Sequence, residues 1–436
     1  MSTPIRGPGW NSLAVWCLLD PKAPVRVGVL SLVAGGRGVA FTYDDTWIRT
    51  GFALSGDMPL VKSPIVPEVQ GELPGALADS MPDRWGERAI RALDNPPRAS
   101  PLDFLYLAGD HRFGALGFSI NQKVYEPHDR GPLPDLGSIE SLTDLIDKID
   151  DGGLLSDQEK LLASSTRTMG GAHAKALVSI DGEQWVAKFP RDTQVDMPLI
   201  EYASLRLAQR CGIHVAESKK LATLRGHVIL VKRFDRDGYR RLHTLSAKTI
   251  LQHGATPETP PEGQLSYAAL AAFVRTAAQA NSVNDAQREI FRRMVFNILI
   301  ENTDDHEKNH AFIRDGVHWQ LAPAYDILPT LQNIDSHGLE IGDLGAEGSL
   351  ENALTQVAHF GLTRDQAIDE WFAMAAVVDR WKDSFKADGV TDHDISEIER
   401  FIDVDWRKAF RQKSAIDTLK SSNKSPSVVV SKKHSK

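Results

Sequence analysis

Short β-like runs, separated by turns, occupy the first part of the chain, and the last part has the hydrophobic spacing of helices. The β-like runs cover residues 13–19, 26–32 and 38–43. Residues 79–93 and 102–108 instead have the spacing of helices. Because side chains repeat every second residue in a strand and about every 3.6 residues in a helix, the pattern predicts a β-containing N-terminal part that continues into helices.

The clearest strand signals lie in the middle of the chain. Residues 176–180 and 184–189 flank Asp181-Gly182, a dipeptide typical of two-residue hairpin turns. A helix is expected over residues 199–211. A second strand pair is expected over residues 217–224 and 227–234. Hairpin, helix and hairpin in this order predict a small lobe that covers ATP.

The last part of the chain is predicted to be mainly helical. A long helix ending near Asn302 has an apolar face, and Asn284 with Gln287 suggests a capping-box start. A second hairpin is expected around Asp315-Gly316. Further helices are predicted over residues 363–382 and 391–410.

The chain has 436 residues, which suits two or three domains. We expect an N-terminal part over residues 1–150, an ATP-covering lobe over 151–236, a helical catalytic lobe over 237–415 and a disordered Ser/Lys-rich tail over 416–436. The predicted fold class is α+β, with an antiparallel sheet in the smaller lobe and an extra N-terminal subdomain.

Net charge and cysteine content limit the expected binding partners and cellular compartment. A formal charge of −8 argues against general nucleic-acid binding. Two cysteines, Cys17 and Cys211, make no disulfide framework and suit a reducing cytoplasm. The best apolar run, Met294–Ile300, is too short for a membrane span and contains Asn297. We therefore expect a cytoplasmic protein without a membrane partner.

One constellation has the residue types that phosphoryl transfer needs. Asp304 follows the long helix, Asn309 comes five residues later, and a hairpin leads to Asp326. Lys188 ends an upstream strand, and Glu201 on the next helix is placed to orient it. An acceptor-site carboxylate, oxygen ligands for Mg²⁺ and a cation for the phosphates occur in this order in protein kinases. The pattern predicts a kinase that uses ATP and Mg²⁺.

The same stretch also matches a zinc-peptidase pattern. His306-Glu307-Lys308-Asn309-His310 fits H-E-x-x-H, which on a helix would place two histidines on one face. We discount this alternative because the stretch follows the end of the predicted helix and leads into a strand. No third ligand follows at a familiar spacing either. The ring of His306 is expected to hydrogen-bond backbone within the catalytic loop.

Several segments together resemble the HipA-type kinases, the toxins of bacterial toxin–antitoxin pairs. The catalytic and metal-binding segments of that family resemble NTDDHEKNH at 302–310 and LAPAYDIL at 321–328. Its N-terminal region resembles residues 78–88 and 104–118. Its phosphate loop, lysine strand and hinge resemble TMGGAHAKALV at 168–178, AKFP at 187–190 and VKRFDR at 231–236.

The resemblance assigns roles to individual residues. It implies Asp304 as catalytic base and Asn309 with Asp326 as Mg²⁺ ligands. The nucleotide-binding group that it implies comprises Lys188, Glu201, the backbone of Arg233 and Phe234, Tyr325, His306 and the loop residues Gly170, Gly171, Ala172, His173 and Lys175. The family also phosphorylates itself at the start of this loop, for which the candidates are Thr168, Ser165, Ser164 and Thr166.

Three positions depart from the family pattern. Thr168 stands where the family usually has serine, His173 where it often has glutamine, and Lys232 where the hinge often has glutamate. The first two put self-inactivation and loop chemistry in question. The third affects adenine binding only if its side chain makes the contact.

Two other functions are alternatives to a protein kinase for this set of residues. An inactive, nucleotide-binding interaction module is one, although the intact Lys188, Asp304, Asn309 and Asp326 argue against it. A small-molecule kinase is the other. The resemblance implies a protein substrate such as an aminoacyl-tRNA synthetase, a small DNA-binding antitoxin that provides an indirect link to DNA, and an assembly that includes homodimers.

Overall fold

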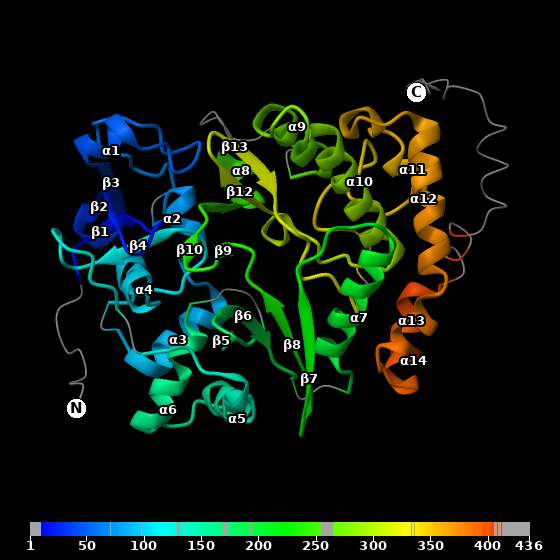
Figure 1. Cartoon of the computed structure of the whole chain (residues 1–436), viewed down its shortest axis with the longest axis horizontal. Coiled ribbons are helices and arrows are strands. Elements are labelled where there is room, and N and C mark those ends of the chain that lie inside the picture. Colours follow the sequence, from blue (N-terminus) through cyan, green and yellow to red (C-terminus); the bar gives the residue numbers. More distant parts are fainter. Residues whose placement is uncertain are drawn as a thin grey trace, which may run out of the picture.

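The computed structural model describes residues 10–404 except 70, 97, 129–130, 169–172, 192–193, 254–264, 333 and 335, and beyond them residues 408 and 411. An N-terminal antiparallel sheet lies on one side, a second antiparallel sheet lies centrally, and helices α9 to α14 lie on the other side (Figure 1). The chain therefore has the predicted two-lobed kinase-like α+β architecture with an added N-terminal subdomain.

The N-terminal sheet has the order β3-β2-β1-β4. Its strands are β1 (Ser12–Cys17), β2 (Val25–Val33), β3 (Gly38–Tyr43) and β4 (Leu116–Ser119). Leu13, Val15 and Phe41 from this sheet are fully buried, because alternate side chains of each strand face the core. Helices α1 (Asp45–Thr50) and α4 (Pro101–Leu107) belong to the same part.

The helix predicted over residues 79–93 is two helices, so that prediction was wrong in its extent. Helix α2 covers Gly75–Asp79 and α3 covers Arg84–Asp94. Pro82 lies in the break, where it has no N–H to donate and disfavours helical backbone in the residue before it. The turn between α2 and α3 points residues 79–85 toward the catalytic lobe, as described below.

The polar residues before the central sheet contain helices that the sequence analysis did not predict. Helix α5 covers Ile139–Asp150, α6 covers Asp157–Leu162, and the short helix η3 covers Ala163–Thr166. Apolar residues of α5, including Leu142 and Ile146, pack in one core with Trp185 of the central sheet. Helix α5 is therefore part of the support of that sheet.

The central sheet has the order β5-β6-β8-β7 and is antiparallel throughout. Its strands are β5 (Lys175–Ile180), β6 (Glu183–Lys188), β7 (Ser218–Thr223) and β8 (Gly226–Lys232), with α7 (Met197–Arg210) between β6 and β7 in the chain. Asp181 and Gly182 both have positive φ, at 52° and 81°, as the predicted tight hairpin turn requires. The predicted hairpin–helix–hairpin order is confirmed.

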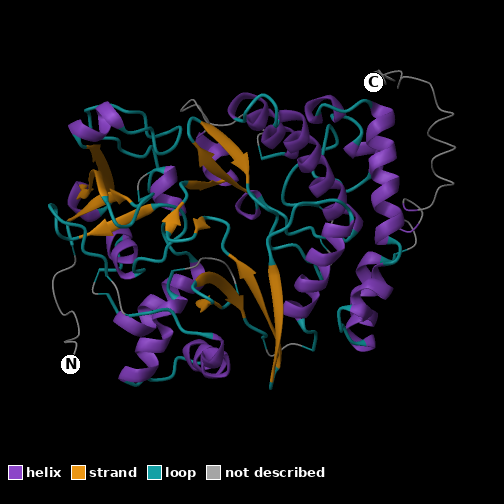
Figure 2. Ribbon diagram, viewed as in Figure 1, coloured by secondary structure: helices purple, strands orange, loops and turns teal. Residues whose placement is uncertain are grey.

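The C-terminal lobe combines small sheets with many helices (Figure 2). Strands β9 (Arg236–Asp237) and β10 (Arg240–Arg241) pair, and a further sheet joins β11 (Thr244–Ser246), β12 (Ala311–Asp315) and β13 (His318–Leu321). The helices are α8 (Ala247–His253), α9 (Tyr267–Ala277), α10 (Val283–Leu299), α11 (Leu350–Ala353), α12 (Arg364–Val378), α13 (Trp381–Ala387) and α14 (Asp392–Ile402).

Two helix predictions in this lobe need correction. The N-cap of α10 is Ser282, and no side-chain cap hydrogen bond is formed there. Gln287 does not close a capping box, because it is buried and donates to the carbonyls of Ala271 and His359. Residues 363–382 form parts of two helices, α12 and α13, which are separated at Asp379 and Arg380.

One hydrophobic core extends from the N-terminal sheet to the C-terminal helices. It includes Leu13 and Phe118 of the N-terminal sheet together with Phe296 of α10 and Trp371 of α12. The N-terminal part is therefore packed against the lobes as part of one body. Among the described residues, no helix has both the length and the apolar character needed to cross a membrane.

Candidate active site

The candidate site begins with Lys188 at the end of β6. Its ammonium nitrogen Nζ lies 2.5 Å from Oε1 of Glu201 on α7 and 2.5 Å from Oδ1 of Asp326. Burial alone would lower the pKa of Lys188, but the two carboxylates outweigh burial and raise that pKa. The side chain therefore stays a cation, and the lysine–glutamate pair that active kinases require is formed.

Asp326 lies after the β12–β13 hairpin and contacts Lys188 of the central sheet. A parallel bridge between Ala324 and Val215 holds the preceding residues, and Asp326 itself has a φ of 59°. Lys175 on β5 adds a second cation, with its Nζ 3.8 Å from Oδ2 of Asp326. Lys188 and Lys175 outweigh burial and hold the pKa of Asp326 well below its usual range.

Asp304 and Asn309 occupy one short loop after α10. Asp304 is exposed, and Asn309 is buried with its Nδ2 donating to the carbonyl oxygen of Asp304 over 3.3 Å. The hydroxyl oxygen of Thr330 accepts from the backbone N–H groups of Thr303 and Asp304, at 3.0 and 3.2 Å. The loop backbone is thereby held while the Asp304 carboxylate faces solvent.

A buried polar network lies beneath this loop. Asp305 accepts hydrogen bonds from the hydroxyl of Tyr267 and from Nε2 of His310, the latter at 2.9 Å. Asn297 Nδ2 donates to the Tyr267 oxygen, and Asn302 Nδ2 donates to Oδ1 of Asn297. Burial alone would raise the pKa of Asp305, but His310 and the hydrogen bonds lower it. Asp305 therefore joins the start of the loop to its end as a buried carboxylate.

The histidines of H-E-x-x-H do not share a helix face. The stretch forms a single 3₁₀ turn at Glu307–Asn309, with extended backbone at His306 and His310. Nδ1 of His306 accepts from the backbone N–H of Lys308, and Nε2 of His310 contacts Asp305. In the described part of the chain, no group of three His, Cys, Asp or Glu side chains is arranged to hold a metal. The local backbone thus lacks the geometry of the zinc-peptidase motif.

The hinge between the lobes carries an aromatic row. The ring of Phe234 lies 5.2 Å from that of Tyr325 and 6.2 Å from that of Phe113, measured between centroids. The hydroxyl of Tyr325 donates to the carbonyl of Lys308. The backbone N–H of Arg233 is used in the sheet, where it donates to Gln184. An adenine contact at Arg233 would therefore involve its carbonyl group.

The Arg233 side chain is a structural clasp. It pairs with Asp235 through two hydrogen bonds, of 2.9 and 2.7 Å. It also donates to the carbonyls of His111 and Arg112, which belong to the N-terminal part. All these contacts of the buried guanidinium stabilise the fold. A contact of Arg233 with a nucleotide would therefore involve its backbone.

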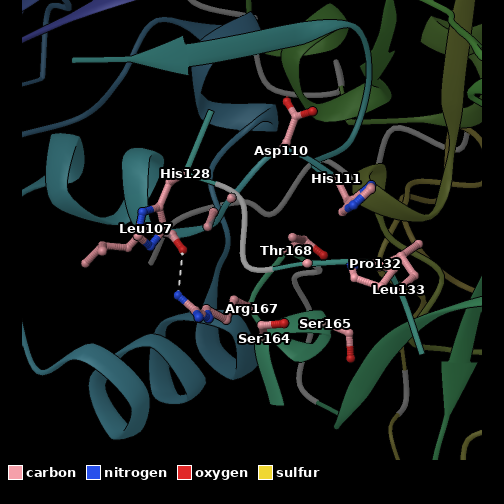
Figure 3. A pocket seen from close by; sticks show the side chains of 13 residues that line it. Leu107, Asp110, His111, His128, Pro132, Leu133, Ser164, Ser165, Arg167 and Thr168 are labelled. Carbon is pink, nitrogen blue, oxygen red and sulfur yellow. Dashed lines mark hydrogen bonds between the residues drawn. The ribbon is translucent and has the colours of Figure 1, made fainter. Parts of the chain in front are cut away.

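Three of the four autophosphorylation candidates line a separate pocket (Figure 3). Ser164, Ser165 and Thr168 line it together with Arg167 and residues 107–111. Ser165, Thr166 and Thr168 are buried, and Arg167 is held by an ion pair of 2.7 Å to Asp94. The described lining includes none of the catalytic-site residues named above. Gly170, Gly171 and Ala172 lie outside the described residues, and His173 is exposed just before β5.

The structure thus gathers Lys188, Glu201, Lys175 and Asp326 directly, and Asp304 with Asn309 on one loop. Sequence reasoning missed the supporting residues Thr330, Tyr267, Asp305 and His310. Polar residues inside apolar helices, such as Asn297 within the longest apolar run, were the available signal.

Two family models match the chain. The HipA N-terminal domain matches residues 23–119, and the HipA-like C-terminal domain matches residues 167–381. Together they cover well over half of the sequence.

Individual proteins are also similar. A Sinorhizobium fredii (strain NBRC 101917 / NGR234) protein named "Putative kinase Y4mE" is 26% identical over 320 residues, which is 67% of this chain and 72% of that protein. A Haemophilus influenzae protein named "Putative kinase" is 30% identical over 138 residues, or 29% of this chain and 40% of that protein. The HipA structure from the Shewanella oneidensis MR-1 HipA, HipB and operator DNA complex has a TM-score of 0.68 at 18% identity, covering 94% of this chain and 99% of that one. This likeness shows the shared fold.

Proposed function

The chain belongs to the HipA family, and we propose that it is an ATP- and Mg²⁺-dependent kinase that phosphorylates serine or threonine on a protein. The observation that carries the proposal is the contact of Lys188 with both Glu201 and Asp326, at 2.5 Å each. A strand lysine paired with a helix glutamate beside a metal-binding aspartate is the arrangement that phosphoryl transfer uses in kinases.

The residues present suit Mg²⁺. Asp326 offers a carboxylate and Asn309 an amide oxygen, and Mg²⁺ in phosphoryl-transfer sites takes one or two such protein ligands together with substrate phosphates and water. When bound there, Mg²⁺ would neutralise charge on the phosphate oxygens. Lys188 and Lys175 would supply cations to the same phosphates.

The proposed reaction moves the γ-phosphoryl group of ATP to a hydroxyl. A bond forms between the hydroxyl oxygen and the γ-phosphorus while the bond from that phosphorus to the β–γ bridging oxygen breaks, which leaves ADP. Asp304, exposed at the loop, would orient the hydroxyl and take its proton. Tyr325, Phe234 and the hinge backbone would hold the adenine.

The proposal also includes binding partners, which are inferred from the family. The similar HipA was solved with HipB and operator DNA, which supports a small DNA-binding antitoxin as a partner here. We further propose a protein substrate of the aminoacyl-tRNA synthetase type, homodimer formation, and self-phosphorylation within Ser164, Ser165, Thr166 or Thr168. Ser165, Thr166 and Thr168 are buried, so self-phosphorylation at any of these three would require the segment to leave the conformation described above.

The test is incubation of the purified chain with γ-labelled ATP, Mg²⁺ and a bacterial lysate, followed by identification of labelled proteins and labelled residues. Asp304→Ala should abolish transfer and leave ATP affinity within roughly threefold, since Asp304 acts on the acceptor hydroxyl. Asp315→Ala, on the exposed β12–β13 turn, is the matched control and should transfer normally. Transfer by Asp304→Ala at the wild-type rate would refute the assignment. ATP binding by the wild type without transfer would favour an interaction module instead.

A further inference from the structure

The turn between α2 and α3 in the N-terminal part reaches both lobes of the candidate kinase. On the catalytic side, Oδ2 of Asp83 lies 2.8 Å from Nζ of Lys308, in the loop between Asp304 and Asn309. On the side of the central sheet, the indole Nε1 of Trp85 donates to the carbonyl oxygen of Lys175 over 3.1 Å. Asp83, the N-cap of α3, and Trp85, in the first turn of that helix, therefore contact the two lobes.

Lys308 lies at the centre of the catalytic loop. It occupies the 3₁₀ turn Glu307–Asn309, and its carbonyl accepts from the hydroxyl of Tyr325 over 2.8 Å. Asn309, the next residue, hydrogen-bonds the carbonyl of Asp304. Lys308 is therefore adjacent to the proposed metal ligand Asn309, which in turn hydrogen-bonds the backbone of the proposed base Asp304.

The contact of Trp85 with Lys175 also lies next to the candidate site. The ammonium of Lys175 lies 3.8 Å from Asp326, and its backbone carbonyl receives the Trp85 indole. Trp85 has only 1% of its surface exposed, so the hydrogen bond is protected from water. The indole thus anchors the strand that carries one of the two cations on Asp326.

Asp79 supports the other end of the catalytic loop. Its carboxylate accepts from the backbone N–H and the hydroxyl of Ser246, at 2.7 and 2.6 Å. The next residue, Ala247, donates its N–H to the carbonyl of His310, where the loop ends. The α2–α3 turn therefore holds the loop at Lys308 directly and at His310 through Ser246 and Ala247.

The backbone of the turn is constrained in a way that suits this position. Pro82 interrupts the helix, and Arg84, directly after Asp83, has a φ of 27°. Positive φ in a residue with a side chain is costly and persists only where the surrounding structure enforces it. Asp83, before Arg84, pairs with Lys308, and Trp85, after it, is buried, so contacts on both sides of Arg84 constrain its backbone.

We propose that the α2–α3 turn with its flanking residues (79–85) is a brace between the two lobes beside the candidate site, and that Asp83 is a positioning residue for phosphoryl transfer through Lys308. The inference rests on the proposed kinase function. It gives the N-terminal part a direct role in setting the geometry of the catalytic loop. Any partner that moved this turn would change the transfer rate without touching the nucleotide.

The test uses the full chain, γ-labelled ATP and a protein that becomes labelled in the lysate experiment described above. It measures kcat and the KM for ATP. Asp83→Asn should lower kcat about threefold to tenfold with little change in the KM for ATP, because the ion pair is half-exposed and acts on loop geometry. Asp83→Glu keeps the charge and should stay within about twofold of the wild type. The matched control is Asp150→Asn on α5, which breaks another half-exposed ion pair, with Arg88 of α3.

A second variant keeps the test decisive if Asp83→Asn folds poorly. Trp85→Phe keeps the buried ring and removes only the indole donor to Lys175, so it should lower kcat in the same way. Circular dichroism and the unfolding midpoint establish that each variant is folded. A kcat for folded Asp83→Asn and Trp85→Phe equal to that of Asp150→Asn would overturn the brace. Absence of transfer by the wild type would instead overturn the proposed function on which the brace rests.

Discussion

Lys188 and Asp326 are separated by 138 positions in the sequence and meet with Nζ 2.5 Å from Oδ1. The contact couples a strand of the central sheet to the segment after the β12–β13 hairpin. Because Asp326 has a positive φ of 59°, its carboxylate is held there by a backbone conformation that few non-glycine residues adopt. The pair marks the centre of the candidate active site.

Replacing Asp326 should weaken the binding of magnesium and ATP together. Asp326→Asn removes the charged metal ligand and leaves Lys188 paired with Glu201 alone. We expect the affinity for ATP in the presence of Mg²⁺ to fall by at least about tenfold, as for loss of a charge-assisted contact. Calorimetric titration with and without Mg²⁺ measures this, with Asp315→Asn as control. Equal affinities for the wild type and Asp326→Asn would contradict the ligand assignment.

Metal removal should distinguish magnesium from zinc. A chelator that binds Mg²⁺ should abolish phosphate transfer, and added Mg²⁺ should restore it, because the proposed ligands are oxygen atoms. A chelator selective for zinc should leave transfer unchanged, since the His306–His310 stretch is a 3₁₀ turn between extended residues. Loss of activity with the zinc chelator, restored by zinc alone, would revive the peptidase-type site.

The buried network under the catalytic loop should matter for stability and activity together. Asp305→Ala leaves the hydroxyl of Tyr267 and Nε2 of His310 without their shared acceptor, which should lower the free energy of unfolding by about 3 kcal/mol. Tyr267→Phe removes one donor only and should lower it by about 1 kcal/mol. Denaturant titration measures both, and Asp315→Ala should stay within about 0.5 kcal/mol of the wild type. A change of that small size in Asp305→Ala would show that the network is not coupled to folding.

Mild acid should destabilise the junction between the N-terminal part and the catalytic lobe. Burial lowers the pKa of His243 from 6.5 to about 4, with Arg314 acting in the same direction and the hydrogen bond to Leu54 opposing it. Between pH 6.5 and 4 the unfolded chain therefore binds a proton that the folded chain does not. As the pH falls from 6.5 to 4, the free energy of unfolding should decrease by at most about 3 kcal/mol on account of this group. Above pH 6.5 the group should cause no such loss of stability.

The measurement is denaturant unfolding at a series of pH values. His243→Gln should flatten the pH dependence between pH 6.5 and 4, where the imidazole would otherwise gain its proton on unfolding. The same change at His393, an exposed residue of α14, serves as control and should keep the wild-type slope. An unchanged slope in His243→Gln would assign the acid sensitivity to other groups.

Local patterns predicted much of the fold and part of the site. The Asp181-Gly182 turn and the strands around it were predictable because a two-residue hairpin turn demands positive φ from both residues. Lys188, Glu201, Asp304, Asn309 and Asp326 were recognisable because kinase chemistry requires these residue types in this order. The buried role of Gln287 was missed because its partners, the carbonyls of Ala271 and His359, are distant in sequence. The break at Pro82 is a local effect of proline on the backbone, and the helical spacing of residues 79–93 concealed it.

The sequence by itself determined which chemical groups are available and in which order they occur along the chain. Only the tertiary structure decided that Lys188 meets Asp326, that Asp305 ties Tyr267 to His310, and that Asp83 of the N-terminal part reaches Lys308. The physical reason is that periodicity and turn preferences act over a few residues, whereas these contacts depend on one core packed across the whole chain.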